Sequence, residues 1–300
     1  MIYDCAIIGG GPAGLNAALV LGRARRSVIL LDNGQPRNAV THESHGFITR
    51  DGVKPAEFRR IAVEEVLRYP SVKHTQTEVT AVSKTGAGFE MQTEQGTRIQ
   101  SRKLILATGL KETFPDIEGF HQMYGKSLFN CPYCDGWELR DSLLVVVSEK
   151  PAAFHMAKLV LNWSKDLVVC TNGHPVLTDE QKEKLQSKGV SVFEKPIAAF
   201  TGTNGRLDQI RFTDGTYIHR TGGFITPQLT PKAGFGEKLG CELTELGGVK
   251  TDEFGRSSVP GVYAAGDSAY VMPSSLILAA AAGSLTASGV NMDLIEEDFD

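Results

Sequence analysis

The sequence lacks any long cluster of lysine and arginine, and its formal net charge is −4, from 31 basic and 35 acidic residues. Concentrated positive charge is what binds nucleic acid and anionic membrane surfaces, so we expect neither as a partner. The longest late apolar run, residues 276–282, is too short to cross a bilayer. No basic region or cleavage site follows Met1, so we also expect no signal peptide.

Cysteine is scarce as well, at five residues that cannot all pair. Cys5, Cys170 and Cys241 stand alone in apolar or mixed segments, which is typical of small buried side chains. Unpaired cysteines of this kind favour a reducing, cytoplasmic location.

The other two cysteines lie in the tetrad Cys131-Pro132-Tyr133-Cys134, which Asp135 follows directly. Two thiols at this spacing can close a small disulfide ring, and an adjacent carboxyl group can deliver or accept the proton that their chemistry needs. The alternative is a structural zinc site, but zinc takes four ligands and the sequence has no second Cys-x-x-Cys or ligand-spaced His pair. The tetrad therefore predicts thiol-disulfide redox chemistry and no metal.

A dinucleotide fingerprint opens the chain. An apolar run at residues 3–8 ends in Gly9-Gly10-Gly11-Pro12-Ala13-Gly14, and good helix formers follow. A second apolar run ends in Asp32, at the distance of about 20 residues that the fingerprint requires. Gly9 permits a sharp turn, Gly11 lets backbone approach a pyrophosphate, Gly14 lets helix pack on strand, and Asp32 can accept hydrogen bonds from a ribose.

The same pattern occurs a second time. Residues 143–147 begin another strand-turn-helix unit, and residues 166–170 form its next strand. Two further strands, at residues 103–109 and 261–267, run into glycine turns. The chain is therefore internally duplicated, and we expect an α/β protein with one domain inserted in the other.

Four motifs in this order, Gly-x-Gly-x-x-Gly, Ala-Thr-Gly, Cys-x-x-Cys-Asp-Gly and Ala-Ala-Gly-Asp, resemble the low-molecular-weight thioredoxin reductases, which are class II pyridine nucleotide-disulfide oxidoreductases. The match covers nearly the whole chain. It implies two Rossmann-like, three-layer ββα domains: an FAD-binding domain of residues 1–112 and 243–300, and an NADPH-domain-like insertion of residues 113–242 that carries the cysteines. It also implies a homodimer.

The resemblance assigns roles to individual residues. Cys134 would face the flavin, Cys131 would exchange with substrate, and Asp135 would be the acid-base group, with helix capping as its alternative. Residues 37–46 resemble the branch that closes disulfides in secondary metabolites, which places His45 near the flavin unless it is an ordinary loop histidine. The cofactor-binding positions are Gly9, Gly11, Pro12, Ala13, Gly14, Asp32, Asn38, His45, Thr108, Gly109, Gly266 and Asp267.

The second nucleotide motif departs from the family pattern. Its three glycine positions are Ser148, Glu149 and Lys150, so side chains stand where phosphate should meet backbone. The following strand runs into residues 170–174, which contain no arginine for a 2′-phosphate. We therefore expect weak or absent NADPH binding. Electrons would then come from a ferredoxin-like donor, or from a small-molecule dithiol with oxygen as the acceptor.

Three smaller expectations concern other segments. Ser274-Ser275 stands roughly where the reductases carry an Arg-Gln pair beside the flavin. Core packing accounts for Trp137, although an aromatic residue here could also line a substrate path. The acidic tail at residues 296–300 is expected to be frayed, and the alternative is a flap that places Phe299 near a neighbour's flavin.

These patterns together predict an FAD-dependent thiol-disulfide oxidoreductase acting with a thioredoxin-like protein or a small-molecule disulfide. An NADPH-dependent thioredoxin reductase and an oxygen-using dithiol oxidase remain alternatives. A flavin redox sensor ranks lowest, because Asp135 and both tetrad cysteines are intact.

Overall fold

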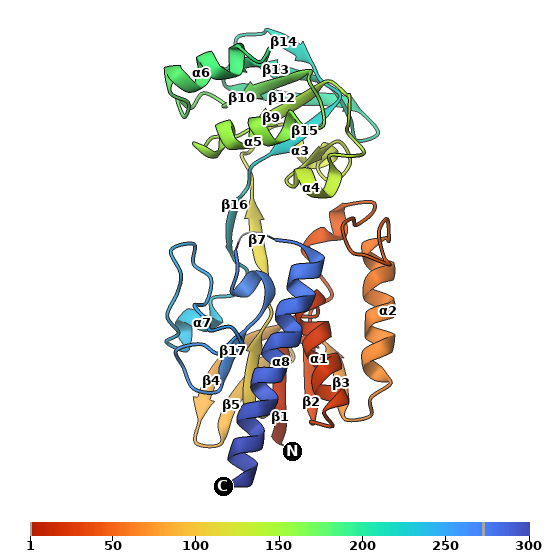
Figure 1. Ribbon diagram of the computed structural model, residues 1–300, viewed down its shortest axis with the longest axis vertical. Coiled ribbons are helices and arrows are strands. Elements are labelled where there is room, and N and C mark those ends of the chain that lie inside the picture. Colours follow the sequence, from red (N-terminus) through yellow and green to blue (C-terminus); the bar gives the residue numbers. More distant parts are fainter. Residues whose placement is uncertain (1, 272–273) are drawn as a thin grey trace. The chain divides into compact units, whose positions relative to one another are not determined.

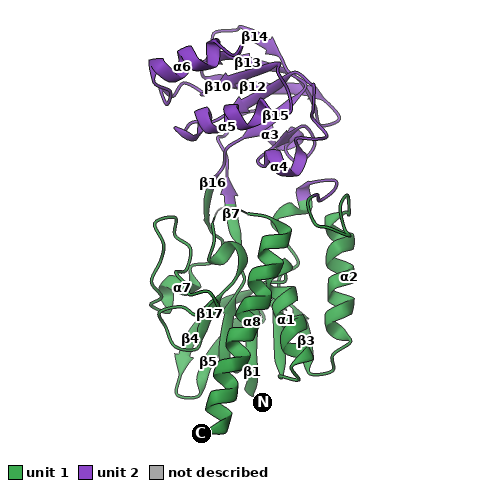
Figure 2. Cartoon of the chain, viewed as in Figure 1, with its two compact units in different colours: residues 1–39, 46–111, 229–300 green, residues 40–45, 112–228 purple. Residues whose placement is uncertain are grey.

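The chain folds into two compact units (Figure 2) in a computed structural model that describes residues 2–271 and 274–300. Unit 1 comprises Met1–Ala39, Gly46–Lys111 and Leu229–Asp300, and unit 2 comprises Val40–His45 and Glu112–Gln228. Most of unit 2 is thus inserted within unit 1. The chain returns to unit 1 after Gln228, earlier than the return at residue 243 that the sequence suggested.

Unit 1 is built on a largely parallel sheet with helices packed against it (Figure 1). Its seven strands follow the order β3-β2-β1-β6-β5-β4, with β17 also paired to β6. β1, β2, β3, β6 and β17 pair in parallel, whereas β4 and β5 attach as an antiparallel hairpin. The elements are β1 (Ile2–Ile8), α1 (Pro12–Arg23), β2 (Val28–Asp32), η1 (Arg37–Val40), α2 (Pro55–Leu67), β3 (Val72–Gln76), β4 (Val79–Thr85), β5 (Gly88–Thr93), β6 (Arg98–Leu106), β7 (Leu110–Thr113), β16 (Gln228–Pro231), α7 (Phe235–Lys238), β17 (Val262–Ala264), η2 (Gly266–Ser268) and α8 (Leu276–Phe299).

The two faces of this sheet bury different cores, because successive side chains of a strand point to opposite sides. In β1, Cys5 and Ile7 join the core formed with α1 and α8, whereas Ala6 and Ile8 join the core formed with β4, β5 and α7. All four side chains are buried. Both faces of β1 are therefore covered, as its uniformly apolar sequence requires.

Unit 2 repeats the plan with shorter strands. Five strands form a parallel sheet in the order β11-β10-β9-β15-β8, and β12, β13 and β14 form a separate antiparallel sheet. The elements are α3 (Phe120–Met123), β8 (Leu128–Phe129), α4 (Pro132–Asp135), β9 (Leu144–Val147), α5 (Ala152–Val160), β10 (Leu167–Cys170), α6 (Asp179–Gln186), β11 (Ser191–Phe193), β12 (Ile197–Thr203), β13 (Arg206–Phe212), β14 (Tyr217–His219) and β15 (Gly222–Ile225).

The core of unit 2 has two layers around β9. Val145 and Val147 pack with residues of the three-stranded sheet, whereas Leu144 and Val146 pack with residues of α5 and α6. The parallel sheet therefore lies between a smaller sheet and a helical layer. This is the three-layer Rossmann-like arrangement that the sequence predicted.

The C-terminal tail is helical rather than frayed. α8 continues to Phe299. Lys103 pairs with Glu297, and Arg26 Nη1 lies 2.6 Å from Asp298 Oδ2. Arg102 contacts both acidic residues. The expectation of a frayed end is therefore wrong, because cations far away in the sequence hold the last turn.

The apolar run at residues 276–282 forms the first two turns of α8. Across residues 2–271 and 274–300, none of the helices combines the length and the apolar character needed to span a membrane.

The turn between β1 and α1 depends on close backbone contacts. Gly9 has φ +109°, and a Cβ atom there would lie 2.1 Å from the carbonyl oxygen of Ala107. A Cβ at Gly14 would lie 1.9 Å from the carbonyl oxygen of Gly9. Gly11 is different, since its φ is −75° and nothing lies within 4 Å of a Cβ built there.

We predict that Gly9→Ala lowers the free energy of unfolding by about 2–4 kcal/mol, since it combines an unfavourable φ with a backbone clash. Gly11→Ala is the matched control and should change that free energy by less than about 1 kcal/mol, because the position has open space and an ordinary φ. Urea unfolding of both variants, freed of any bound cofactor, measures the difference. Equal stability of the two variants would contradict this account of the turn.

Candidate active site

The redox tetrad lies at the start of a short helix in unit 2. Cys131 is the N-cap residue of α4, and Pro132 occupies its first turn, where its missing N–H costs nothing. Cys131 and Cys134 form a disulfide with their Cα atoms 5.3 Å apart, and both are partly exposed. The other three cysteines are free and buried, as the sequence predicted.

Asp135 completes α4 and is 8 % exposed. Burial, followed by the nearby negative charge of Glu138, raises the pKa of this carboxyl group to about 7, while His45 acts in the opposite direction. Asp135 is not the cap of the helix, because Cys131 takes that position. A carboxyl group that titrates near neutrality beside a disulfide is suited to proton transfer in either direction.

His45 lies in unit 2, in an acidic setting. Its Nε2 is 3.6 Å from Glu138 Oε1 and 3.9 Å from Glu43 Oε2. Asp135 also interacts with it electrostatically. His45 was predicted as a cofactor neighbour, and its surroundings within unit 2 relate it to Asp135.

An aromatic surface adjoins the disulfide. Tyr133, inside the tetrad, makes an edge contact with Trp163 at a ring-centroid distance of 5.7 Å. Trp137 is 66 % exposed, and the Arg140 guanidinium lies 4.1 Å from its ring centroid. The expectation that core packing accounts for Trp137 is therefore wrong. Tyr133 and Trp137 are both exposed, so the tetrad and the residues that follow it present aromatic side chains to solvent.

The glycine turn of unit 1 offers space where a pyrophosphate would lie. Gly11 is the N-cap residue of α1, Pro12 is its first residue and Ala13 is buried behind it. The first N–H groups of a helix have no partner within the helix, so this end can bind an anion. The absence of any atom within 4 Å of a Cβ at Gly11 leaves backbone accessible to a ligand.

Asp32 lies at the end of β2 and is nearly buried. Its carboxylate accepts a hydrogen bond from Arg59 Nη2 of α2. Arg59 Nε and His74 Nε2 are buried and have no hydrogen-bond partner among the described atoms. A ribose and its attached base would bring acceptors and hydroxyl groups to this cluster, so the residues present suit an adenosine.

Asp267 is fixed by two side chains of unit 1, those of Arg37 and Ser274. Arg37 Nη2 lies 2.8 Å from Asp267 Oδ2, and Ser274 Oγ donates to both carboxylate oxygens. Arg37 belongs to η1, which also contains the predicted site residue Asn38. Ser274-Ser275 stands where the reductases carry an Arg-Gln pair after Asp267, but Arg37, far away in the sequence, places an arginine next to Asp267.

The Ala-Thr-Gly and Ala-Ala-Gly-Asp motifs meet through Ser268. Its hydroxyl accepts a hydrogen bond from Gly109 N at 2.9 Å and lies 3.3 Å from Thr108 Oγ1. Thr108 and Ser268 also line a small cavity of about 40 Å³. Gly266 begins η2, directly before Asp267. The four predicted positions in these two motifs therefore lie together at one edge of the unit 1 sheet. They are Thr108, Gly109, Gly266 and Asp267.

The corresponding turn of unit 2 is filled by side chains. Ser148 is buried, and Lys150 Nζ donates to the carbonyl oxygen of Pro227 at 3.1 Å. Glu149 Oε1 accepts a hydrogen bond from Asn172 Nδ2 at 2.5 Å. Asn172 Oδ1 in turn accepts from Ile197 N at 2.7 Å. The loops after β9 and β10 are thus joined by side chains at the place where unit 1 keeps an open glycine turn.

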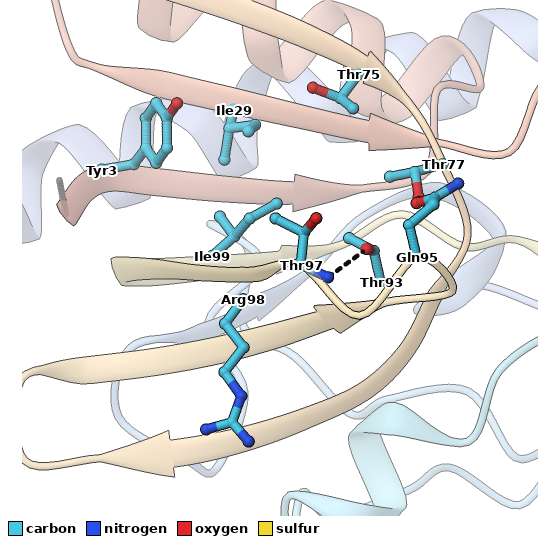
Figure 3. A pocket seen from close by; sticks show the side chains of 9 residues that line it. All are labelled: Tyr3, Ile29, Thr75, Thr77, Thr93, Gln95, Thr97, Arg98 and Ile99. Carbon is cyan, nitrogen blue, oxygen red and sulfur yellow. Dashed lines mark hydrogen bonds between the residues drawn. The ribbon is translucent and has the colours of Figure 1, made fainter.

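A larger cavity lies elsewhere in unit 1, on the sheet beside β3 and β6 (Figure 3). Its volume is about 320 Å³, and its polar lining includes a hydrogen bond from Thr97 N to Thr93 Oγ1. None of the predicted site residues lines it. The lining residues are Tyr3, Ile29, Thr75, Thr77, Thr93, Gln95, Thr97, Arg98 and Ile99.

The predicted residues fall into two groups. Cys131, Cys134, Asp135 and His45 belong to unit 2, and the remaining positions belong to unit 1. The sequence analysis did not identify the residues that contact these predicted positions. Among them, only Glu138 could have been found from its place in the sequence, because it closely follows the tetrad. The missed residues are Arg37, Arg59, Glu138, Asn172 and Ser268.

The chain is similar to known proteins over nearly its full length. A family model described as pyridine nucleotide-disulphide oxidoreductase matches residues 3–283. Thioredoxin reductase sirT from Leptosphaeria maculans is 34 % identical, covering 99 % of this chain and 96 % of that protein. A thioredoxin reductase from Helicobacter pylori is 26 % identical over 96 % of this chain and 98 % of its own length.

Among solved structures, a putative thioredoxin reductase TrxB from Bacillus anthracis aligns with a TM-score of 0.95 and 47 % identity, covering 99 % of both chains. Similarity of this extent includes the disulfide of unit 2 and the glycine turn of unit 1 within one alignment. The chain therefore belongs to the pyridine nucleotide-disulphide oxidoreductase family, as a disulfide oxidoreductase of the thioredoxin reductase-like type.

Proposed function

We propose that this protein is an FAD-dependent thiol-disulfide oxidoreductase that moves electrons between flavin and the Cys131–Cys134 pair, and on to or from a protein or small-molecule disulfide. We further propose that it does not use NADPH in the usual way. The observation that carries the proposal is a contrast between the turn after β1 in unit 1 and the turn after β9 in unit 2. The first leaves open space at Gly11, whereas side chains of residues 148–150 occupy the second.

The residues of unit 1 suit FAD. Gly11 leaves room for a pyrophosphate at the start of α1, Asp32 with Arg59 would hold the adenosine ribose, and Asp267 with Arg37 would hold the ribityl chain. When bound, FAD supplies two-electron redox chemistry that amino acid side chains lack. The fixed positions of Asp32 and Asp267 would orient its two ends.

The reaction at the cysteines then follows ordinary thiol-disulfide exchange. In the reductive direction, the Cys131 thiolate attacks a substrate disulfide and releases one substrate sulfur, which takes a proton. The Cys134 thiolate next attacks the Cys131 sulfur, which releases the second substrate sulfur and restores the Cys131–Cys134 disulfide. Asp135 delivers or removes the protons, and the same steps reversed would oxidise a substrate dithiol.

The altered turn of unit 2 argues against ordinary NADPH binding. Phosphate would have to replace the Glu149–Asn172 hydrogen bond and come close to the Glu149 carboxylate. Like charges at this distance disfavour each other, and the side chains occupy the backbone positions that phosphate uses. A ferredoxin-like donor or a substrate dithiol would meet neither the charge repulsion nor the occupied backbone positions, because it need not bind at this turn.

Several finer assignments belong to the same proposal. The exposed aromatic surface at Tyr133 and Trp137 suits either a thioredoxin-like protein or an apolar small molecule. We carry over from the family resemblance a homodimeric assembly, and from the buried free cysteines a cytoplasmic location. The proposal also assigns FAD binding to unit 1 and the redox cysteines to unit 2.

Adding a methyl group at Gly11 should weaken FAD binding. Gly11→Ala fills the space proposed for the pyrophosphate, so we expect the dissociation constant for FAD to rise at least about tenfold. Gly86→Ala is the matched control, because Gly86 also has nothing within 4 Å of a built Cβ but lies outside the turn. Titration of apoprotein with FAD, followed by flavin fluorescence, measures both. An unchanged constant for Gly11→Ala would refute the FAD assignment.

The electron donor can be identified by reducing the FAD-loaded protein anaerobically and following flavin absorbance. We expect dithiothreitol to bleach the flavin rapidly, Cys134→Ser to abolish that bleaching, and micromolar NADPH to act far more slowly. A reduced ferredoxin tests the remaining donor. Rapid bleaching by micromolar NADPH would overturn the proposed departure from the family, and slow reduction by every donor would favour a redox sensor.

Asp135 should impose a pH dependence on thiol-disulfide exchange. Because its pKa is raised to about 7, the protonated form is present below this pH and is lost above it. Glu138→Gln removes a charge that raises this pKa, so the inflection should move to lower pH. Asp135→Asn should remove the inflection and slow exchange by about 100-fold.

Stopped-flow measurement of substrate thiol release between about pH 5.5 and 9 resolves these profiles. Glu180→Gln is a suitable control, because Glu180 lies on α6 away from α4 and is paired with Lys184. An Asp135→Asn variant that keeps both the rate and the inflection would show that another group moves the proton.

A further inference from the structure

The segment that leads into the redox tetrad is very short. β8 ends at Phe129, Cys131 is the N-cap residue of α4, and Asn130 is the only residue between them. On its other side, Cys131 is tied into α4, because its carbonyl oxygen accepts hydrogen bonds from Cys134 N at 3.1 Å and Asp135 N at 3.2 Å. A contact that holds Asn130 therefore limits where the Cys131 sulfur can move.

Glu112 holds Asn130 from another part of unit 2. Glu112 Oε1 accepts a hydrogen bond from Asn130 Nδ2 at 2.5 Å, although the two residues lie 18 positions apart in the sequence. Both side chains are partly buried. A hydrogen bond to a carboxylate is stronger than one between neutral groups, and partial shielding from water strengthens it further. Asn130 is thus restrained by a strong contact directly before the first cysteine of the tetrad.

The other oxygen of the Glu112 carboxylate is anchored to an aromatic cluster. Glu112 Oε2 accepts a hydrogen bond from the Tyr124 hydroxyl at 2.8 Å. The Tyr124 ring packs against Phe114 and Phe120, at ring-centroid distances of 4.5 Å and 5.2 Å. Phe120 is buried in the core of unit 2, and Phe114 packs against that core. The carboxylate is therefore fixed by packed side chains and is not free to follow Asn130.

We propose that Glu112 is a positioning residue for Cys131, which it keeps within reach of Cys134, through Asn130, when both cysteines are thiols. This inference rests on the proposed function, because it requires the pair to alternate between disulfide and dithiol. Two thiols that are already held close lose less conformational freedom when they form a disulfide. Glu112 thereby stabilises the disulfide relative to the dithiol and lowers the reduction potential of the pair.

A contact that serves only to hold unit 2 together has a different consequence. Such a contact is equally strong in the disulfide and dithiol forms, and an interaction shifts an equilibrium only by the difference in its strength between the two states. Its removal would lower the free energy of unfolding of both forms and leave the reduction potential unchanged. The reduction potential therefore separates a positioning role of Glu112 from general stabilisation.

The test equilibrates the FAD-loaded protein with mixtures of reduced and oxidised dithiothreitol in the absence of oxygen. Reduced dithiothreitol gives two electrons and two protons to the Cys131–Cys134 disulfide and closes into its own cyclic disulfide. Free thiols are trapped with iodoacetamide and counted by mass spectrometry. We expect Glu112→Ala and Asn130→Ala each to favour the dithiol about tenfold, which corresponds to about 30 mV for two electrons. The double variant should add little, because both changes remove the same hydrogen bond.

Glu118→Ala is the matched control, because Glu118 is an exposed glutamate six residues further along the same segment. It should leave the reduction potential unchanged. Tyr124→Phe removes the hydrogen bond to Glu112 Oε2 but keeps the contact with Asn130. It should therefore shift the potential less than Asn130→Ala does.

Exchanging the two partner groups tests the contact without removing it. Glu112→Gln/Asn130→Asp interchanges the carboxylate and the amide, so a donor and an acceptor still face each other, and the Gln oxygen can still accept from Tyr124. Asn130→Asp alone sets two carboxylates against each other. The interchanged pair should therefore restore a potential closer to that of the wild type than Asn130→Asp alone gives.

Circular dichroism and urea unfolding establish that each variant is folded. A wild-type potential in folded Glu112→Ala and Asn130→Ala would overturn the positioning role and leave the proposed function intact. If either variant does not fold, equal potentials for Asn130→Asp and the interchanged pair would overturn it instead. A wild-type disulfide that dithiothreitol does not reduce would overturn the proposed function, and the role of Glu112 with it.

Discussion

Close backbone contact around Ala13 is the constraint on which unit 1 depends. Gly283 of α8 approaches the Ala13 carbonyl oxygen, and a Cβ at Gly266 would lie 2.8 Å from the Ala13 Cβ. The glycine turn, the Asp267 motif and the C-terminal helix thus meet at the first turn of one helix. A larger residue at any of these glycines would push apart the elements that form the candidate cofactor site, and the same contacts fix which face of α8 points outward.

The two Rossmann-like units show how one topology can carry two different turns. Both place a strand, a turn and a helix in the same order, and both bury the strand on two faces. The difference lies in the turns. Gly11 leaves backbone uncovered, whereas Glu149 and Asn172 satisfy each other and join two loops. Polar groups that are already hydrogen-bonded within the chain gain little from a phosphate, which supports the proposed departure from ordinary NADPH binding.

The sequence allowed the glycine turn, the redox tetrad, the buried free cysteines and the three-layer arrangement to be predicted, because each rests on local spacing or on strand alternation. It did not reveal pairs formed between distant segments. Arg37 lies 230 residues from Asp267, and Arg59 lies 27 residues from Asp32. Trp137 and the acidic tail were misjudged for a related reason, since exposure and ion pairing depend on neighbours that only the folded chain supplies.

The protonation of Asp135 is set by a balance that only the fold creates. Burial favours the neutral form of Asp135, Glu138 adds to that preference, and His45 opposes it. The result is a pKa near 7, at which the carboxyl group is about equally able to give and to take a proton. In the proton-transfer role that we propose for it, Asp135 would therefore not select the direction of the reaction. Direction must follow from the relative reduction potentials of the substrate and the electron donor.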